Sequence, residues 1–122
     1  MRWDFYMKHF FKLSELREEH AATGKRYLEF LHVSSLSSGI YVLPSQSEDL
    51  QTPHHQDEIY YVISGRGRMK ITREENVATG ASSEDRLVNA GSVIFVEAGT
   101  EHRFHSIAEE LVVLVVFGPA EG

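Results

Sequence analysis

Residues 87–117 read LVNAGSVIFVEAGTEHRFHSIAEELVVLVVF. Short runs of β-branched and aromatic residues alternate in this stretch with glycine-centred turns, at a spacing of roughly ten residues. Residues 26–33, 39–44 and 58–72 have the same strand-like composition. Gly65 and Gly67 interrupt the last of these runs, as a turn or bulge between two paired strands would. Short strands at this spacing predict an all-β sandwich or barrel.

Three segments complete the predicted architecture. Ser14 and the following ELREEH predict a short helix with Ser14 as its N-cap and Gly24 as its C-terminal stop. Residues 73–86 are small and polar and predict an exposed loop. Residues 111–117 are apolar on both faces of a strand, so a second layer or a second subunit must cover the outer face.

Composition and charge exclude several classes of protein. The 122 residues suffice for one domain with one core. A net charge of −6 repels a phosphate backbone, so we expect no nucleic-acid partner. The sequence contains neither a signal-peptide-like apolar stretch near its start nor the roughly 20 apolar residues that span a bilayer. These features predict a cytoplasmic protein that does not bind membranes.

Histidines cluster in two windows, each just before a predicted strand. His54 and His55 precede Glu58 in the first window, and His102 and His105 form the second. The sequence has no cysteine, so a metal ion would need nitrogen and oxygen ligands. Two imidazoles and a carboxylate suit one divalent ion of Fe, Mn, Zn or Ni. The alternative is that these histidines are ordinary polar residues at strand ends.

At these residues the sequence resembles the cupin superfamily. His54, Glu58 and Gly65 match the end of the family's first motif, and Gly91, Gly99 and His102 fall in register with its second. The resemblance implies a double-stranded β-helix, or jelly-roll barrel, with a short N-terminal helix. It implies one domain over residues 1–122, with an N-terminal extension of about 1–36 and a barrel core of about 37–118.

The ligand set that the resemblance implies is His54, Glu58 and His102. The family's first histidine position is occupied by Thr52, its proline position by Glu97 and its asparagine position by Ser106. A fourth ligand would therefore be His55, Gln51 or water.

Alternation along the strands predicts which side chains share the barrel interior. If Glu58 points inward, Tyr60 and Val62 do so as well, and Ile59, Tyr61 and Ile63 face outward. The same rule puts His102, Phe104 and Ser106 inside and His105 outside. The outward apolar side chains need cover, which favours a homodimer, and cupins that resemble this chain are commonly dimers.

Two functions compete for this site. The first is a metal-dependent enzyme acting on a small organic ligand, such as a mononuclear non-haem dioxygenase, an isomerase or a lyase. Tyr60 and Glu97 are its candidate catalytic residues, and its predicted substrate pocket is formed by Thr52, Gln56, Tyr60 and Phe104. The second is a non-catalytic module that binds or senses a small molecule. The cupin fold does not choose between them.

Overall fold

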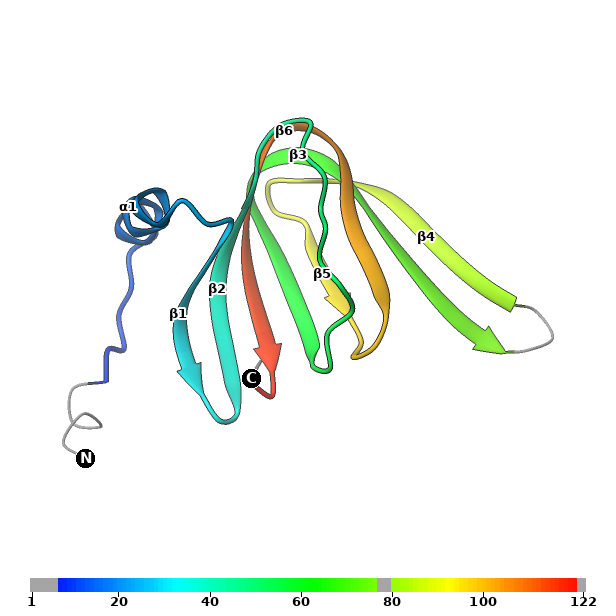
Figure 1. The fold of residues 1–122 in the computed structure, drawn as a ribbon, viewed down its shortest axis with the longest axis horizontal. Helices are drawn as coiled ribbons and strands as arrows, with labels where there is room; N and C mark the ends of the chain where they lie inside the picture. The colour runs from blue at the N-terminus through cyan, green and yellow to red at the C-terminus, as the bar shows by residue number, and fades with distance from the viewer. Residues whose placement is uncertain (1–6, 77–79, 121–122) are drawn as a thin grey trace.

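The computed structural model describes residues 7–76 and 80–120 and places one helix and six strands there. The elements are α1 (Leu13–Thr23), β1 (Tyr27–Val33), β2 (Leu36–Leu43), β3 (Asp57–Asn76), β4 (Gly80–Asn89), β5 (Val93–Val96) and β6 (Glu101–Gly118). The strands pair antiparallel in the order β1-β2-β6-β3-β4, and β5 pairs with β3 (Figure 1). The predicted all-β jelly roll with a short helix is confirmed.

Strands β3 and β6 run through the whole sheet and bend together. Residues 57–64 of β3 pair with the end of β6, and residues 66–72 pair with its beginning. Three register shifts lie between Val62 and Arg68. Gly65 has a φ of 97°, and a Cβ there would lie 2.0 Å from the carbonyl oxygen of Glu110. The glycines therefore mark a bend within one strand, and the hairpin that the sequence predicts inside residues 58–72 is wrong.

The β3–β4 hairpin takes the place of the exposed loop predicted for residues 73–86. Arg73 pairs with Ser82 and Lys70 with Asp85 across this hairpin, which extends away from the rest of the sheet (Figure 1). Cross-strand hydrogen bonds and ion pairs such as Arg68–Asp85 support strands whose composition alone disfavours them. The middle of the predicted loop, residues 77–79, lies outside the described residues.

The helix is longer than predicted and begins earlier. It spans 11 residues after Lys12 as N-cap, so the prediction of Ser14 as N-cap is wrong. Gly24 ends the helix in the left-handed conformation with a φ of 69°, as predicted. No helix in the described ranges is long and apolar enough to cross a membrane.

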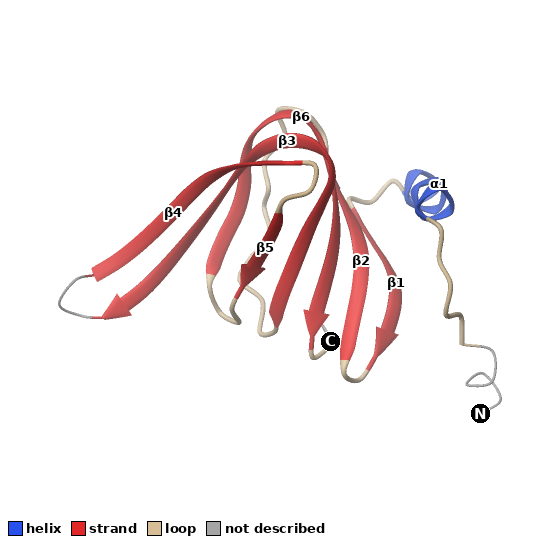
Figure 2. Cartoon of the chain, turned by 180° about the vertical axis from the view of Figure 1, so that it is seen from behind, coloured by secondary structure: helices blue, strands red, loops and turns tan. Residues whose placement is uncertain are grey.

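Part of the outer face of the last strand is covered by this helix. Leu16 of α1 packs in one cluster with Ile40 and Val42 of β2 and Val112 of β6. Figure 2 shows α1 next to β1 and β2, at the end of the sheet opposite to β4. The chain itself therefore supplies part of the second layer, while Leu114 and Val116 remain partly exposed.

The inner face holds the main core, as alternation predicts. Glu58, Tyr60 and Val62 are buried, whereas Ile59 and Tyr61 are 45% and 43% exposed. Phe104 is also buried. The inward placement of Ser106 is wrong, because the backbone there adopts a φ of 50° and breaks the alternation, so Ser106 is exposed.

Candidate metal centre

Three side chains from separate segments meet near the first residues of β3 and β6. His54 lies in the loop before β3, Glu58 is the second residue of β3, and His102 is the second residue of β6. One ligand atom from each residue lies within 4.8 Å of the other two. The amide of Gly99 donates to the carbonyl of His54 at 2.7 Å, which ties the two ligand-bearing loops together.

The carboxylate of Glu58 is the most constrained group of the three. Glu58 is 2% exposed, and its Oε1 lies 2.6 Å from His102 Nε2. Its Oε2 lies 4.0 Å from His54 Nε2. Neither oxygen receives a well-aligned hydrogen bond from the part of the chain that the structure describes. A buried carboxylate needs a positive charge beside it, and a cation bound between Glu58 and the two imidazoles would supply one. The residues present therefore fit a divalent metal ion.

The ring of His102 is held in one orientation. Its Nδ1 lies 2.8 Å from the carbonyl of Thr100, so Nδ1 carries the proton and Nε2 faces Glu58. Burial by itself lowers the pKa of His102. Contact with the Glu58 carboxylate and the hydrogen bond to Thr100 raise this pKa, and together they outweigh burial. In the absence of a metal, this shift favours the protonated form of His102 beside the Glu58 carboxylate.

Tyr60 lies against the cluster as a hydrogen-bond donor. Its hydroxyl donates to Gln51 Oε1 at 3.0 Å and lies 2.9 Å from His102 Nε2. Burial, together with the negative charges of Glu58 and Asp49, raises the pKa of Tyr60 well above its ordinary value. Tyr60 consequently stays protonated and can donate a hydrogen bond, but it is a poor general base.

A buried aspartate that the sequence analysis missed organises the loop before β3. Asp49 is 7% exposed and accepts hydrogen bonds from Tyr41 Oη at 2.6 Å, Gln51 Nε2 at 2.7 Å and the amide of Phe104 at 2.9 Å. It thereby connects the loop that carries His54 to the strand that carries His102. The sequence gives no signal for this role, because Asp49 lies in a polar stretch typical of exposed loops.

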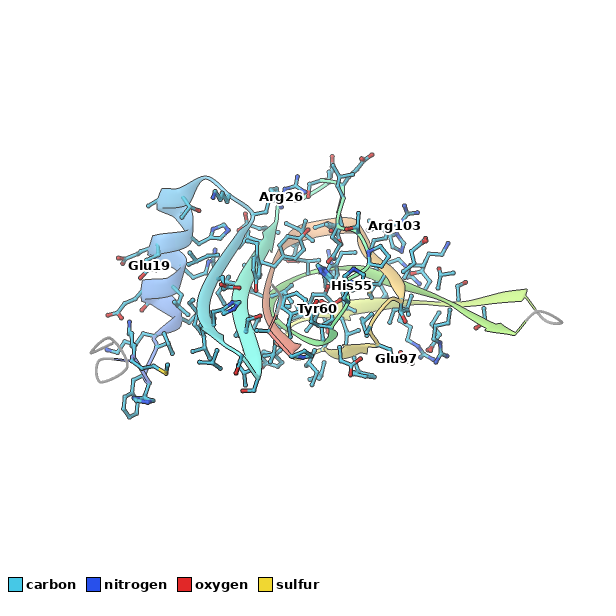
Figure 3. All side chains as sticks on the ribbon, turned by 60° about the horizontal axis from the view of Figure 1, so that its bottom comes forward. Glu19, Arg26, His55, Tyr60, Glu97 and Arg103 are labelled. Atoms are coloured by element: carbon cyan, nitrogen blue, oxygen red, sulfur yellow. The ribbon has the colours of Figure 1, made fainter. Side chains whose placement is uncertain are left out.

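Of the two residues predicted as a possible fourth ligand, only Gln51 adjoins the cluster. Its Oε1 is 3.2 Å from His54 Nε2. His55 is exposed, on the loop in front of Tyr60 in Figure 3. His105, predicted to face outward, pairs with Asp85 at 2.9 Å and does not join the cluster.

The cavity beside the cluster differs from the predicted substrate pocket. It has a volume of about 160 Å³ and is lined by Tyr27, Tyr41, Gln51, His54, Tyr60, Val115 and Phe117. Of the four predicted pocket residues, only Tyr60 lines it. Thr52 is exposed, Gln56 donates to the carbonyl of Ala120, and Phe104 lies behind Tyr60 with a ring-centroid distance of 5.2 Å.

The structure does not bring Glu97, the second candidate catalytic residue, to this cavity. Glu97 is exposed just after β5, and its carboxylate lies 3.9 Å from Arg73. In Figure 3 Glu97 lies at the rim of the curved sheet, whereas Tyr60 lies within it. Because a turn follows β5, strand alternation does not determine the direction of this side chain.

Comparison with known proteins agrees with this geometry. The family model of the cupin domain matches residues 39–117, so the chain belongs to the cupin domain family. An uncharacterized protein of Streptomyces coelicolor, SCO3923, is 43% identical over 111 residues, which cover 91% of this chain and 96% of that protein.

Two solved structures share the fold at low sequence identity. BH2720 from Bacillus halodurans has a TM-score of 0.68 at 18% identity, with 93% of this chain and 84% of that chain covered. The complex of Fe(II)-HppE with the alternative substrate (S)-1-HPP has a TM-score of 0.58 at 20% identity, with 75% of this chain and 48% of that chain covered. Both likenesses concern the fold alone.

Proposed function

We propose that this cupin binds one divalent transition-metal ion through His54, Glu58 and His102, and that it is an enzyme acting on a small organic molecule in the adjacent cavity. The observation that carries the proposal is the buried Glu58 carboxylate, which faces two imidazoles and receives no well-aligned hydrogen bond from the described residues. Two histidines and one carboxylate with open positions are the ligand set of non-haem Fe(II) oxygenases.

The HppE structure holds Fe(II) with a substrate, so this fold can accommodate a metal ion together with a small organic ligand. A bound metal ion would supply Lewis-acid or redox chemistry at its open positions. The chain's own residues would position the ligand. The Tyr60 hydroxyl donates a hydrogen bond, the Gln51 amide oxygen accepts one, and the aromatic walls exclude water.

Metal content tests the proposal directly. Protein purified in Fe(II)-, Mn(II)- or Zn(II)-supplemented medium is expected to carry about one ion per chain by elemental analysis. The variants H102A and E58Q remove one ligand each and are expected to lower occupancy at least about 10-fold, because the remaining two ligands bind weakly. The exposed neighbour His55 provides the matched control, H55A, which should keep full occupancy. Empty wild-type protein, or full occupancy in H102A, would refute the metal site.

A non-catalytic binding module is the second candidate. The raised pKa of Tyr60 favours it, because Tyr60 is then no general base, and Glu97 lies away from the cavity. Oxygen uptake by Fe(II)-loaded protein with a panel of small acids, diketones and phenols separates the two functions. Substrate-dependent uptake that disappears in E58Q supports the oxygenase, and no uptake with any compound that binds favours the module.

We also propose that two copies of the chain associate through the outer faces of β3 and β5. Ile59, Tyr61, Val93 and Phe95 are 45%, 43%, 68% and 54% exposed there, and the register pairs Ile59 with Phe95 and Tyr61 with Val93. This apolar strip carries no charge among these four residues. A twofold contact of the strip with itself therefore opposes no like charges.

A further inference from the structure

The walls of the cavity beside the proposed metal site are mostly aromatic. Tyr27, Tyr41, Tyr60 and Phe117 form four of its sides. The ring of Tyr27 meets those of Tyr41 and Phe117 edge to face, at centroid distances of 6.3 and 6.4 Å. Rings arranged in this way present both faces and edges to a guest, and a planar ring fits them through offset or edge contacts.

The volume limits the guest to a single ring. The cavity measures about 160 Å³. An apolar cavity of about 150 Å³ in another protein holds one benzene molecule. A second fused ring would extend beyond this volume.

The charges around the cavity disfavour a carboxylic acid. None of the described residues that line it is lysine or arginine. Two buried carboxylates, Glu58 and Asp49, lie next to it and would balance the charge of a divalent ion. The guanidinium of Arg26 donates to the carbonyl of Glu48 and lies close to the Tyr41 hydroxyl. In the metal-free protein, a ligand carboxylate would therefore lie near two carboxylates without a lysine or arginine in the lining to pair with it.

Two polar side chains on the cavity wall, Gln51 and Tyr60, determine which functional group a ligand must carry. Gln51 Nε2 donates to Asp49 at 2.7 Å, and this bond fixes the orientation of the amide so that Oε1 serves as the acceptor toward Tyr60. The Tyr60 hydroxyl is the donor of the pair. Because this hydroxyl already donates to Gln51 at 3.0 Å, a ligand hydroxyl can donate to the second lone pair of Gln51 Oε1. An ether, a carboxylate or a hydrocarbon has no proton to donate there.

From these four observations, and resting on the function proposed above, we infer that the site takes uncharged phenols of one ring. The ligand hydroxyl donates to Gln51 Oε1, and the ring lies against Tyr27 and Phe117. Gln51 thereby becomes a specificity-determining residue, because its acceptor oxygen distinguishes a hydroxyl from groups that cannot donate.

Calorimetric titration of phenol, benzoate and benzene tests the inference on metal-free and Zn(II)-loaded protein whose metal content is measured on the same sample. We expect phenol to bind at least about 10-fold more tightly than benzoate in the metal-free form. Benzoate binding equal to that of phenol in this form would overturn the inference while leaving the metal site intact. Wild-type protein that takes up no zinc but prefers phenol would overturn the proposed function and support the pocket's specificity.

Substitution of Gln51 separates the hydroxyl contact from the fit of the ring. Q51L keeps the side-chain size but removes the acceptor, so we expect it to weaken phenol binding about 10-fold and leave benzene binding unchanged. Q56L is the matched control, because Gln56 bonds to Ala120 and does not line the cavity, and it should bind phenol normally. Equal loss of phenol and benzene in Q51L, or unaltered phenol binding, would overturn the role of Gln51.

Discussion

Replacing Asp49 with asparagine tests whether this residue holds the site together. The carboxylate accepts short hydrogen bonds from Tyr41, Gln51 and Phe104. A hydrogen bond to a charged group contributes about 1.5–3 kcal/mol. Asparagine keeps one acceptor oxygen and turns its amide group toward a former donor. We therefore expect D49N to lose the equivalent of one or two of these bonds, about 3 kcal/mol of unfolding free energy.

Urea denaturation of the metal-free protein measures this loss, and a melting curve should show a fall of about 12 °C at this chain length. The matched control is D85N, because Asp85 is exposed and water screens its ion pairs with Arg68 and His105. The control should therefore lose much less unfolding free energy than D49N. If the unfolding free energy of D49N lies within about 1 kcal/mol of that of the unaltered protein, Asp49 does not support the loop in the way its contacts indicate.

The remaining predictions concern the bend, a surface carboxyl and the outer strip. G65A should destabilise the fold by more than about 3 kcal/mol in urea denaturation, whereas G91A, with positive φ but open space, should cost about 1 kcal/mol. Desolvation is the largest single effect on the pKa of Asp85 and raises it, but the hydrogen bonds and positive charges of His105 and Arg68 together outweigh it, so the net shift is downward. This contribution to stability is present above the unfolded pKa and is lost as pH falls through the folded one, and in H105A the NMR titration of Asp85 should move to higher pH. F95E should shift the chain from dimer to monomer in light scattering, and an unchanged mass would refute the proposed interface.

Local patterns predicted much of the fold and the three ligand positions. Strand alternation placed Tyr60 inside and Ile59 outside, because successive side chains of a strand point to opposite faces. Gly24 was recognised as the helix stop because glycine adopts a left-handed conformation without strain. His54, Glu58 and His102 were predicted from motif spacing, and the structure brings them within reach of one ion.

Contacts between distant segments determined the features of the fold that the sequence did not predict. Gly65 bends β3 because the backbone of Glu110 lies against it, and nothing near Gly65 in the sequence reveals that neighbour. Residues 73–76 and 80–86, which the sequence predicted to be a loop, form part of the β3–β4 hairpin, because the residues opposite them provide hydrogen bonds and opposite charges.

The sequence by itself thus predicted most of the strands and their buried faces, because these depend on residue type and short-range spacing, and its resemblance to cupins indicated the three candidate metal ligands. Only the tertiary structure decided that Asp49 and Gln51 border the site while Thr52, Gln56 and Glu97 do not line it. Their side chains lie in loops and turns, where no period fixes direction. Hydrogen bonds to residues far along the chain, such as Asp49 to Phe104, set these directions instead.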